Sequence, residues 1–382
     1  MRVGARALVA FVAGMVLLAG CGGSSSTSSG EPPVPADVRG PLLVDCWNDT
    51  LTELDPASAA RGRSFAFAAE DDGAVRLCDW SPGDGAGGVT AYRADGTLLA
   101  ASRSGDDDSS HAGFLDVATG TFTDLSARLR LDANGDYTDE GSGVDDFAGP
   151  VKDRVLGFAP DGSLLFVRAA KRYAAAAPGY TDFRRLPDDE LIGLTSPDGS
   201  RTAGTSLWSG VLSLPAGTPD VPPGTDTDPA DVRTPAGFAP IALLGEDVAE
   251  DVGCDRIGWI DDATLLCQDT GSVTLVDLSG AQLVAATDLA EQVASCSLCW
   301  TSSWIWTLPA GSVRDATPAS SRELFGFVAD PARGVAWFLA DAGTAIRLYS
   351  IGSRRGATPK LVGEFQVGDD PTGSSWTGLL VR

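Results

Sequence analysis

Short apolar runs separated by polar turns recur along this sequence. In GFAPDGSLLFV (residues 157–167), two apolar runs flank the tetrapeptide Ala-Pro-Asp-Gly at 159–162. Proline fixes φ at the first central position of a turn, aspartate suits the second, and glycine accepts the positive φ that follows. The pattern predicts a type I turn that closes a β-hairpin. The second run, 164–167, is apolar throughout, which indicates a strand buried on both faces.

The same strand–turn–strand pattern is repeated several times. Close variants start at Gly193 (GLTSPDGSRTAGTS) and Tyr92 (YRADGTLLAAS), and the turn glycines Gly162 and Gly199 lie 37 residues apart. Self-similar units of about 40 residues with four strands each are typical of a β-propeller. Looser copies cover 63–80, 257–289 and 324–353, with a further strand at 360–366, and 111–126 supplies the second hairpin of the Tyr92 unit. Units near residues 63, 90, 154, 191, 255, 300 and 324 predict an all-β fold, a single propeller of seven blades, with six or eight blades left open.

The two ends of the propeller region are both strand-like. GPLLVDCW occupies 40–47, and SWTGLLVR occupies 375–382. A propeller must close its ring, and pairing these two segments in one blade would remove an open sheet edge. We therefore expect them to share a blade.

The repeat also resembles a known family. The unit Phe-Ser/Ala-Pro-Asp-Gly-Ser-x-Leu-x-Phe is similar to the TolB-type and WD-like propeller repeats of exported bacterial proteins, and the resemblance spans residues from about 60 to 370. No Trp-Asp dipeptide ends the units, so the chain departs from a standard WD array. The resemblance implies an exported propeller.

The first residues indicate an export signal and a lipid anchor. Arg2 and Arg6 precede an apolar run of 13 residues, 7–19, which as a helix would span about 20 Å, too short for a bilayer core of about 30 Å. The run is therefore interpreted as a signal-peptide core. Leu-Ala-Gly-Cys at 18–21 resembles the bacterial lipobox, which implies that Cys21 carries acyl chains, palmitate among them, and becomes the new N-terminus.

A Gly/Ser/Pro-rich stretch follows the lipobox and is typical of a flexible tether. We accordingly divide the chain into a signal peptide (1–20), a tether (21–40) and a propeller domain (41–382). More than one acyl chain makes membrane attachment durable. The expected location is the extracytoplasmic face of the cell membrane, with the N-terminal lipid in the bilayer.

Six further cysteines suggest disulfides, because the chain is expected to be exported. Fifteen connectivities are possible, and we favour the local pairs Cys46–Cys78, Cys254–Cys267 and Cys296–Cys299. The second pair flanks a predicted hairpin that turns near Asp261. The spacing of the third pair also suits a redox dithiol or half a zinc site, but no second cysteine pair or histidine cluster completes a zinc site.

Charge and motif content argue against several function classes. The formal net charge is −24, which disfavours binding to nucleic acid and to anionic lipid headgroups. His111 is the one histidine, and it follows the polar stretch SGDDDSS, so we expect it in an exposed loop. The sequence contains no Gly-x-Ser-x-Gly elbow, no Ser-x-x-Lys and no phosphate-binding Gly-x-x-x-x-Gly-Lys. We therefore predict a protein that is not an enzyme.

One acidic stretch has the spacing of a calcium loop. In LDANGDYTDEGSGVDD (131–146), oxygen-bearing side chains fall at every second position, as at the start of an EF-hand or dockerin loop. The candidate ligands are Asp132, Asn134, Asp136 and Thr138. Tyr137 replaces the usual turn glycine, and Gly143 stands where a carboxylate is expected. A solvated acidic loop is the alternative, and a bound calcium would be structural; no other cofactor is expected.

Three tryptophans, Trp300, Trp304 and Trp306, lie close together in the sequence and could stack on a ligand or pack between blades; we favour packing.

The function predicted from the sequence is a non-catalytic platform that binds an envelope protein. The insertions at 131–150 and 215–236 are the candidate recognition elements. Two alternatives stay open: an enzyme that uses carboxylates on cell-wall or extracellular glycans, and a calcium or small-ligand sensor.

Overall fold

The computed structural model describes the residues on which the fold and the site are built. They are residues 37–38, 40–45, 49–66, 75–77, 88–93, 95–105, 108–117, 119–131, 151–187, 190–205, 210–219, 222, 238–240, 242–244, 249–251, 254, 256–269, 272–289, 303–318, 324–343, 345–354, 356–366 and 376–381.

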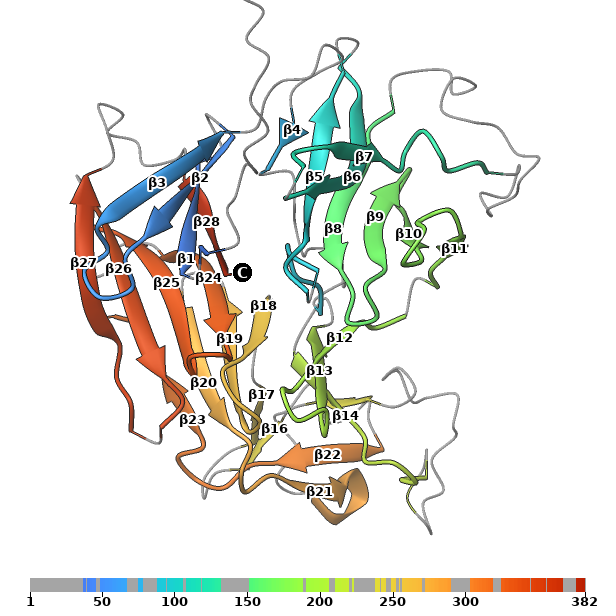
Figure 1. The fold of residues 1–382 in the computed structure, drawn as a ribbon. Helices are drawn as coiled ribbons and strands as arrows, with labels where there is room; N and C mark the ends of the chain where they lie inside the picture. The colour runs from blue at the N-terminus through green and yellow to red at the C-terminus, as the bar shows by residue number, and fades with distance from the viewer. Residues whose placement is uncertain are drawn as a thin grey trace, which may run out of the picture. The chain divides into compact units, whose positions relative to one another are not determined.

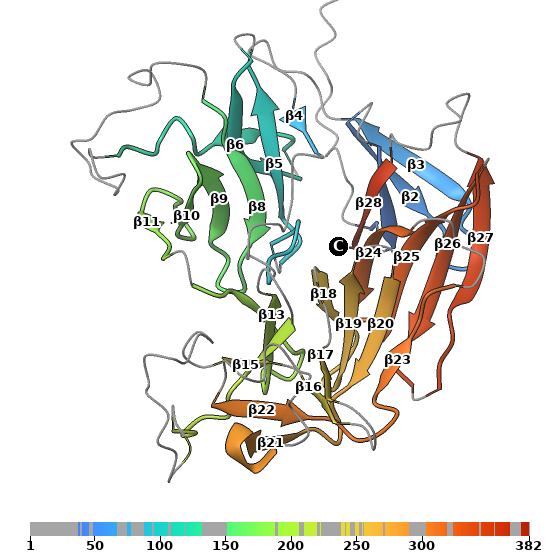
Figure 2. The same cartoon turned by 180° about the vertical axis from the view of Figure 1, so that it is seen from behind.

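The described strands form six antiparallel sheets of four strands each and two sheets of two strands. We call the four-stranded sheets blades 1 to 6, in the order in which they follow the chain (Figures 1 and 2).

In blades 2, 3, 4 and 6 the four strands are consecutive in sequence. Blade 2 contains β4 (Val75–Arg76), β5 (Leu98–Ser104), β6 (Ser110–Asp116) and β7 (Phe122–Asp124). Blade 3 contains β8 (Arg154–Phe158), β9 (Leu164–Arg168), β10 (Lys171–Ala175) and β11 (Phe183–Arg185). Blade 4 contains β12 (Gly193–Thr195), β13 (Thr202–Thr205), β14 (Gly210–Ser213) and β15 (Phe238–Pro240). Blade 6 contains β24 (Leu324–Asp330), β25 (Val335–Asp341), β26 (Ala345–Gly352) and β27 (Lys360–Gln366).

Blade 1 joins the two ends of the propeller. Its inner strand is β28 (Trp376–Val381), and its outer strands are β1 (Pro41–Asp45), β2 (Thr50–Leu54) and β3 (Arg61–Ala66). β1 pairs antiparallel with β28, and Leu42 lies opposite Leu380. The prediction that 40–47 and 375–382 share a blade is confirmed. Each strand satisfies backbone groups of the other, so neither is left as an open edge at the ring closure.

Blade 5 shows why the number of blades differs from the sequence prediction. It contains β18 (Arg256–Trp259), β19 (Thr264–Asp269), β20 (Ser272–Asp277) and β23 (Val313–Asp315). β20 pairs directly with β23, so the chain between these two strands is an insertion within the blade. The unit predicted near residue 300 therefore belongs to blade 5. The described residues form six blades, which is the alternative that the sequence left open beside the favoured seven. The count of seven was too high because a hairpin inside an insertion has the same local pattern as half a blade.

The insertion in blade 5 forms a hairpin of its own. β21 (Gln282–Ala285) pairs with β22 (Trp304–Thr307), and a short 3-10 helix, η3 (Ala286–Leu289), follows β21. The other two-stranded sheet pairs β16 (Ala242–Leu244) with β17 (Ala249–Asp251). Trp306 is buried, and Trp304 packs against the same apolar cluster while its indole N–H donates to the Pro219 carbonyl oxygen at 2.8 Å. The favoured packing role fits both residues; Trp300 lies outside the described residues.

Six apolar cores hold the blades together. Five contain residues from strands of two neighbouring blades, and the sixth joins blade 3 to Ile192, the residue before β12 of blade 4. Burying a leucine or phenylalanine side chain contributes about 1.5–3 kcal/mol, so each core is a substantial source of stability. Starting from blades 1 and 2 and following the ring, the cores are represented by Leu42 with Leu115, Phe114 with Phe166, Leu156 with Ile192, Ala203 with Leu265, Leu266 with Phe338, and Leu339 with Leu43. The last of these joins blade 6 to blade 1, so the six blades form a closed ring.

The repeated Asp-Gly turn has the predicted geometry. The Gly162 N–H donates to the Ala159 carbonyl oxygen at 2.9 Å, and Gly162 has a φ of +83°. The Gly199 N–H likewise donates to the Ser196 carbonyl oxygen at 2.8 Å, with a φ of +73° at Gly199. Each of these turns follows the inner strand of its blade. The repeat therefore places equivalent turns at the same end of the ring.

The disulfide predicted across the hairpin of blade 5 is present. Cys254 and Cys267 are bonded, with their Cα atoms 5.0 Å apart, and both are buried. Cys254 precedes β18, and Cys267 lies in β19, so the bond ties the start of the inner strand to its neighbour. The predicted turn near Asp261 is also confirmed.

Candidate binding site at the centre of the ring

A cavity of about 570 Å³ lies at the centre of the propeller. Figures 1 and 2 show the inner strands around the middle of the ring, and the cavity is lined by strands of blades 1, 3, 4, 5 and 6 together with the segment between β4 and β5 of blade 2. Its volume is in the range of known small-ligand sites, about 300–1,000 Å³. One lining residue from each blade, in the order 1 to 6, is Val381, Arg93, Phe158, Leu194, Arg256 and Phe327.

Part of the cavity wall comes from a segment that crosses between blades, which we call the crossing segment (Gly88–Arg93). A Cβ atom at Gly88 would collide with the backbone of Ile192 beside blade 4, so only glycine allows this close approach. Thr90 exchanges two backbone hydrogen bonds with Phe158 of blade 3, at 3.0 and 2.7 Å.

The hairpin predicted from Tyr92 is confirmed, because Tyr92 lies opposite Leu99 of β5 and the Gly96 N–H donates to the Arg93 carbonyl oxygen at 2.7 Å. The sequence did not indicate the additional contact of Thr90 with blade 3.

The wall of the cavity is mainly apolar. Leu194, Phe327, Val328 and Val381 line it and are only partly buried, and each also packs against an apolar core between blades. Each belongs to an inner strand, β12, β24 or β28. Successive side chains of an inner strand point to opposite faces of the blade, so Phe327 packs against the core shared with blade 5 and Val328 against the core shared with blade 1. The cavity can hold apolar groups.

Arg93 and Asp95 form the best-defined polar contact in the lining. Arg93 Nη2 lies 2.6 Å from Asp95 Oδ2, and Arg93 also donates to Thr97 Oγ1 at 2.7 Å and to Tyr180 Oη at 3.2 Å. The hydrogen bond from Arg93 holds the pKa of Asp95 far below its usual range, and the amide and hydroxyl of Thr97 act in the same direction. Asp95 is therefore a permanent carboxylate that cannot donate a proton near neutral pH.

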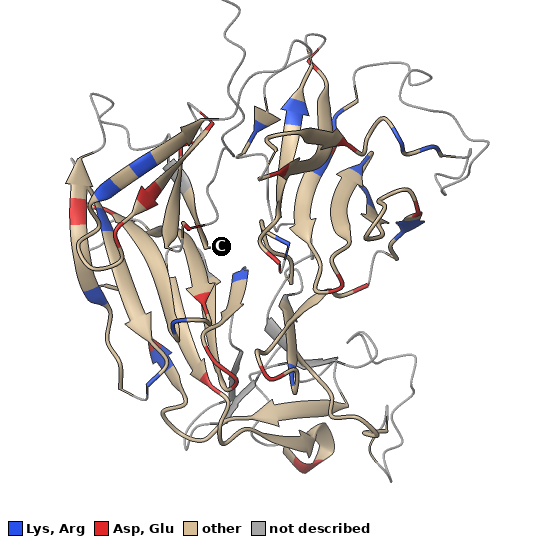
Figure 3. Cartoon of the chain, in the orientation of Figure 1, with Lys and Arg blue, Asp and Glu red and all other residues tan. Residues whose placement is uncertain are grey.

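The turns around Asp95, Pro160, Thr195 and Pro331 form one end of the cavity, which we call the mouth. Exposed carboxylates surround it on the same turns. Asp161 follows Pro160, and Asp198 lies three residues beyond Thr195. The Asp198 N–H donates to Asp262 Oδ1 at 2.8 Å, which links blades 4 and 5. Acidic positions on turns and strand ends are red in Figure 3.

These carboxylates are fixed by local hydrogen bonds. Asp161 Oδ1 accepts from the Ser163 amide at 2.9 Å, and Asp198 Oδ1 accepts from the Ser200 amide at 3.0 Å. The hydrogen bond from the Ser200 amide, followed by those from the Ser196 and Ser200 hydroxyls, lowers the pKa of Asp198. Each oxygen is bound by an amide two residues further on, which is the mechanism by which aspartate favours turns. The mouth therefore carries fixed negative charge.

The carboxylate chemistry of a glycosidase is not present in the described lining. Such enzymes use two carboxyl groups about 5–10 Å apart, one of which must be protonated. Asp95 is the one carboxylate among the described lining residues, and Arg93 keeps it ionised.

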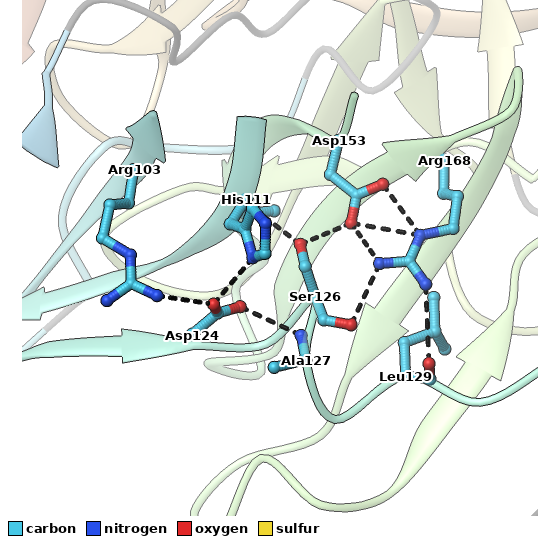
Figure 4. Close-up of polar contacts among 9 residues, drawn as sticks. Arg103, His111, Asp124, Ser126, Ala127, Leu129, Asp153 and Arg168 are labelled. Atoms are coloured by element: carbon cyan, nitrogen blue, oxygen red, sulfur yellow. Dashed lines mark hydrogen bonds and ion pairs between the residues drawn. The ribbon is translucent and has the colours of Figure 1, made fainter. Parts of the chain in front are cut away.

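Figure 4 shows a separate polar network between blades 2 and 3. His111 Nδ1 lies 2.8 Å from Asp124 Oδ2, and Arg103 Nη2 lies 3.1 Å from the same oxygen. His111 is in β6 and is partly buried, so the expectation of an exposed loop is wrong. The polar residues before it form the turn between β5 and β6, and the strand begins one residue before the histidine.

The network contains serine, histidine and aspartate but is not a catalytic triad. The Ser126 hydroxyl donates to Asp153, and its oxygen accepts from the Ala112 amide at 2.8 Å. Because the hydroxyl proton is used by Asp153, it is not directed at His111. Ser126 is fully buried and cannot meet a substrate. This cluster stabilises the contact between two blades.

Most of the residues singled out in the sequence fall outside the described part of the chain. This holds for the lipidation candidate Cys21, for the cysteines Cys46, Cys78, Cys296 and Cys299, and for the calcium candidates Asp132, Asn134, Asp136 and Thr138. Within the described ranges, no group of three or more His, Cys, Asp or Glu side chains is arranged to hold a metal ion. In the same ranges, no helix has the length and hydrophobicity needed to cross a membrane.

Comparison with known proteins shows likeness at the level of architecture only. No family model matches the chain, and no curated protein matches it. A structure of a nidogen/laminin complex is 10% identical, with 89% of this chain and 97% of that chain covered and a TM-score of 0.41. TolB from Acinetobacter baumannii is 12% identical, with 91% and 67% covered and a TM-score of 0.30. A putative 6-phosphogluconolactonase from Bacteroides fragilis is 12% identical, with 89% and 85% covered and a TM-score of 0.36. Likeness this distant says nothing about function, and the propeller assignment is carried by the six blades themselves.

Proposed function

We propose that this protein is a non-catalytic propeller that is exported, held at the membrane by a lipid on Cys21, and binds an envelope protein through the mouth of its central cavity. The observation that carries the proposal is the composition of the lining. Partly buried apolar side chains such as Leu194 and Phe327 line the cavity, whereas the carboxylate there, Asp95, is held ionised by Arg93. Such a lining suits binding, and its described residues include no carboxyl group that is held protonated.

The membrane anchor rests on the leader sequence. Residues 7–19 form a signal-peptide core, and Leu-Ala-Gly-Cys at 18–21 resembles the lipobox. Replacing Cys21 with alanine should release the protein from washed membranes, because two or more acyl chains are needed for durable attachment. If Cys21→Ala protein still partitions fully with salt-washed membranes, the anchor is wrong.

The platform role is tested by cross-linking the tagged protein in its own cells and isolating its complexes. We expect one partner in near-stoichiometric amount. Thr195→Arg should abolish this recovery, since Thr195 is exposed at the mouth and an arginine would occupy the cavity entrance. The matched control is Leu361→Arg, which places the same group on an exposed position of β27 away from the cavity.

Two results would contradict this function. If recovery of the partner is unaffected by Thr195→Arg, the binding surface does not lie at the mouth. Hydrolysis of a cell-wall or extracellular glycan by the purified protein, with no partner recovered, would favour the enzyme alternative. Structural calcium at 131–146 is a separate proposal, and a calcium titration that leaves the melting temperature unchanged would remove it.

A further inference from the structure

We infer that the central cavity binds a small organic acid that has one carboxylate group, which lies at Arg256, and an apolar body, which lies against the cavity wall. The ligand is a single small molecule and not a segment of a protein. The inference goes beyond the proposed function, because it needs neither a protein partner nor a membrane anchor.

The first argument is the charge of the cavity. Its described lining contains two basic side chains, Arg93 and Arg256, and one acidic side chain, Asp95. Arginine stays protonated at neutral pH, and Asp95 is held ionised, so the described lining carries one positive charge in excess. The whole chain, by contrast, has a formal net charge of −24. A positive interior in an acidic protein favours an anion inside the cavity.

The second argument distinguishes the two arginines. Arg93 binds Asp95 through two hydrogen bonds, from Nε to Oδ1 at 3.0 Å and from Nη2 to Oδ2 at 2.6 Å. It also donates to Tyr180 Oη at 3.2 Å and to Thr97 Oγ1 at 2.7 Å. The charge of Arg93 is therefore balanced within the lining, and the excess positive charge of the lining comes from Arg256.

The third argument is the position of Arg256 along the cavity. β18 runs from Arg256 to Trp259, and both residues line the cavity. The turn that follows Trp259 contains Asp262, which accepts the Asp198 N–H at the mouth. A strand rises about 3.3 Å per residue, so the Cα atom of Arg256 lies about 10 Å from that of Trp259 along the strand, in the direction away from the mouth. The guanidinium is therefore separated from the carboxylates of the mouth.

The charges of the site favour a carboxylate over a phosphate. A guanidinium binds either group through two parallel hydrogen bonds. One guanidinium balances one carboxylate, whereas a phosphate dianion would keep an excess negative charge. The carboxylates of Asp161 and Asp198 at the mouth, which amide hydrogen bonds hold in place, repel a dianion more strongly than a monoanion.

The wall of the cavity favours an apolar body on this carboxylate. Leu194, Phe327, Val328 and Val381 line the cavity and are partly exposed, although each also packs against a core between blades. The volume of about 570 Å³ lies within the range of small-ligand sites. A monocarboxylic acid with an apolar chain or ring would pair with the guanidinium and cover this wall.

The binding experiment is isothermal titration calorimetry with two probes of matched size, 4-phenylbutyrate and its neutral amide, 4-phenylbutanamide. The full-length protein is held in phosphatidylcholine nanodiscs, with empty nanodiscs as the blank. We expect the carboxylate to bind at least tenfold more tightly than the amide. Absence of binding by the carboxylate, or equal affinities for the two probes, would overturn the inference.

Matched variants test the role of Arg256. Arg256→Gln removes the charge and keeps a hydrogen-bond donor, and it should bring the two affinities within twofold of each other. Arg256→Lys keeps the charge and should retain at least a threefold preference for the carboxylate. Each preference is a ratio measured in one protein, so a change that only loosens the cavity would weaken both probes alike and leave the ratio intact. An unchanged ratio in Arg256→Gln would overturn the inference, as would loss of the preference in both variants.

Two controls separate the site from other effects. Arg347→Gln removes the same charge from β26, outside the cavity lining, and should leave the ratio unchanged; an equal fall there would show that only net charge acts. Cys21→Ala protein in buffer should show the wild-type preference, because binding does not depend on the anchor. A preference that is lost without the lipid would place the probe at the lipid surface and overturn the inference. Failure to recover a protein partner would contradict the proposed function and leave this titration unaffected.

Discussion

Arg168 Nη2 lies 2.5 Å from Asp153 Oδ2 in an ion pair that is almost completely buried. Both residues belong to blade 3, but the guanidinium also donates to the carbonyl oxygen of Ser126 at 3.0 Å, which follows the last strand of blade 2. The same carboxylate accepts from the Ser126 hydroxyl. One charge pair therefore connects two blades through four polar groups: the guanidinium, the carboxylate, and the carbonyl and hydroxyl of Ser126.

Arg168→Ala should strongly destabilise the propeller. Removing one partner of a buried pair leaves an unpaired charge and costs about 3–5 kcal/mol in the free energy of unfolding. Urea unfolding at neutral pH measures this change. Arg347→Ala is the control, because Arg347 pairs with Glu364 at 2.8 Å on the surface, and its loss should shift the midpoint little. A small effect at both positions would mean that water reaches Asp153 in the folded protein.

His111 should make stability depend on pH near neutrality. The hydrogen bond that protonated His111 donates to Asp124 raises the pKa of His111 above 6.5, against the effect of burial. A pKa that is higher in the folded state gives stability that is fully present below the unfolded value, about 6.5, and that is lost as pH rises through the folded value. The difference in unfolding free energy between wild type and His111→Gln should therefore shrink between pH 6 and pH 8. A difference that grows with pH would contradict the assignment.

Loss of the disulfide should weaken blade 5. The bond closes a short loop, since Cys254 and Cys267 are 13 residues apart, and a loop of this size contributes about 3 kcal/mol. The double change Cys254→Ser and Cys267→Ser should lower the urea midpoint, and a reducing agent should lower the wild-type midpoint in the same direction. Because both cysteines are buried, reduction should be slow in the folded protein. Rapid reduction without unfolding would contradict this.

Two glycines should respond differently to alanine, for different reasons. At Gly199 there is open space for a Cβ atom, so the cost comes only from a φ of +73° and is about 1–2 kcal/mol. At Gly363 in β27, a Cβ atom would collide with the carbonyl oxygen of Ser58 in blade 1. Gly363→Ala must therefore separate blades 6 and 1, and we expect the larger loss of stability. Thermal unfolding of the two variants compares their losses of stability. A larger loss for Gly199→Ala would show that β27 can shift to make room for the Cβ atom at position 363.

Much of the fold could be predicted because the information is local. The type I turn at 159–162 follows from the conformational preferences of proline, aspartate and glycine, and these act within four residues. The hairpin that holds Cys254 and Cys267 follows in the same way. Ring closure by 40–47 and 375–382 was predicted from a general requirement, that a propeller leaves no open strand edge, and needed no knowledge of the register.

The errors arose where the same local sequence pattern is compatible with more than one tertiary arrangement. The segment near residue 300 has the alternation of a strand, but whether β22 forms part of a blade or of an inserted hairpin depends on which strand pairs with β20. His111 follows a polar run, yet the run is a turn and the histidine lies in the strand after it. The alternation of polar and apolar residues determines neither which strand pairs with β20 nor whether His111 lies in a strand.

The sequence by itself determined the architecture class, the repeated turns, the closing pair of strands, the disulfide of blade 5 and the acidic character of the chain, because each depends on neighbours in sequence or on total composition. Only the tertiary structure decided the number of blades, the backbone contact of Thr90 with Phe158 between blades 2 and 3, and the gathering of Asp161, Asp198 and Asp262 around the mouth of the cavity. These depend on contacts between residues that are far apart in the chain, and such contacts are fixed by packing the blades into a ring.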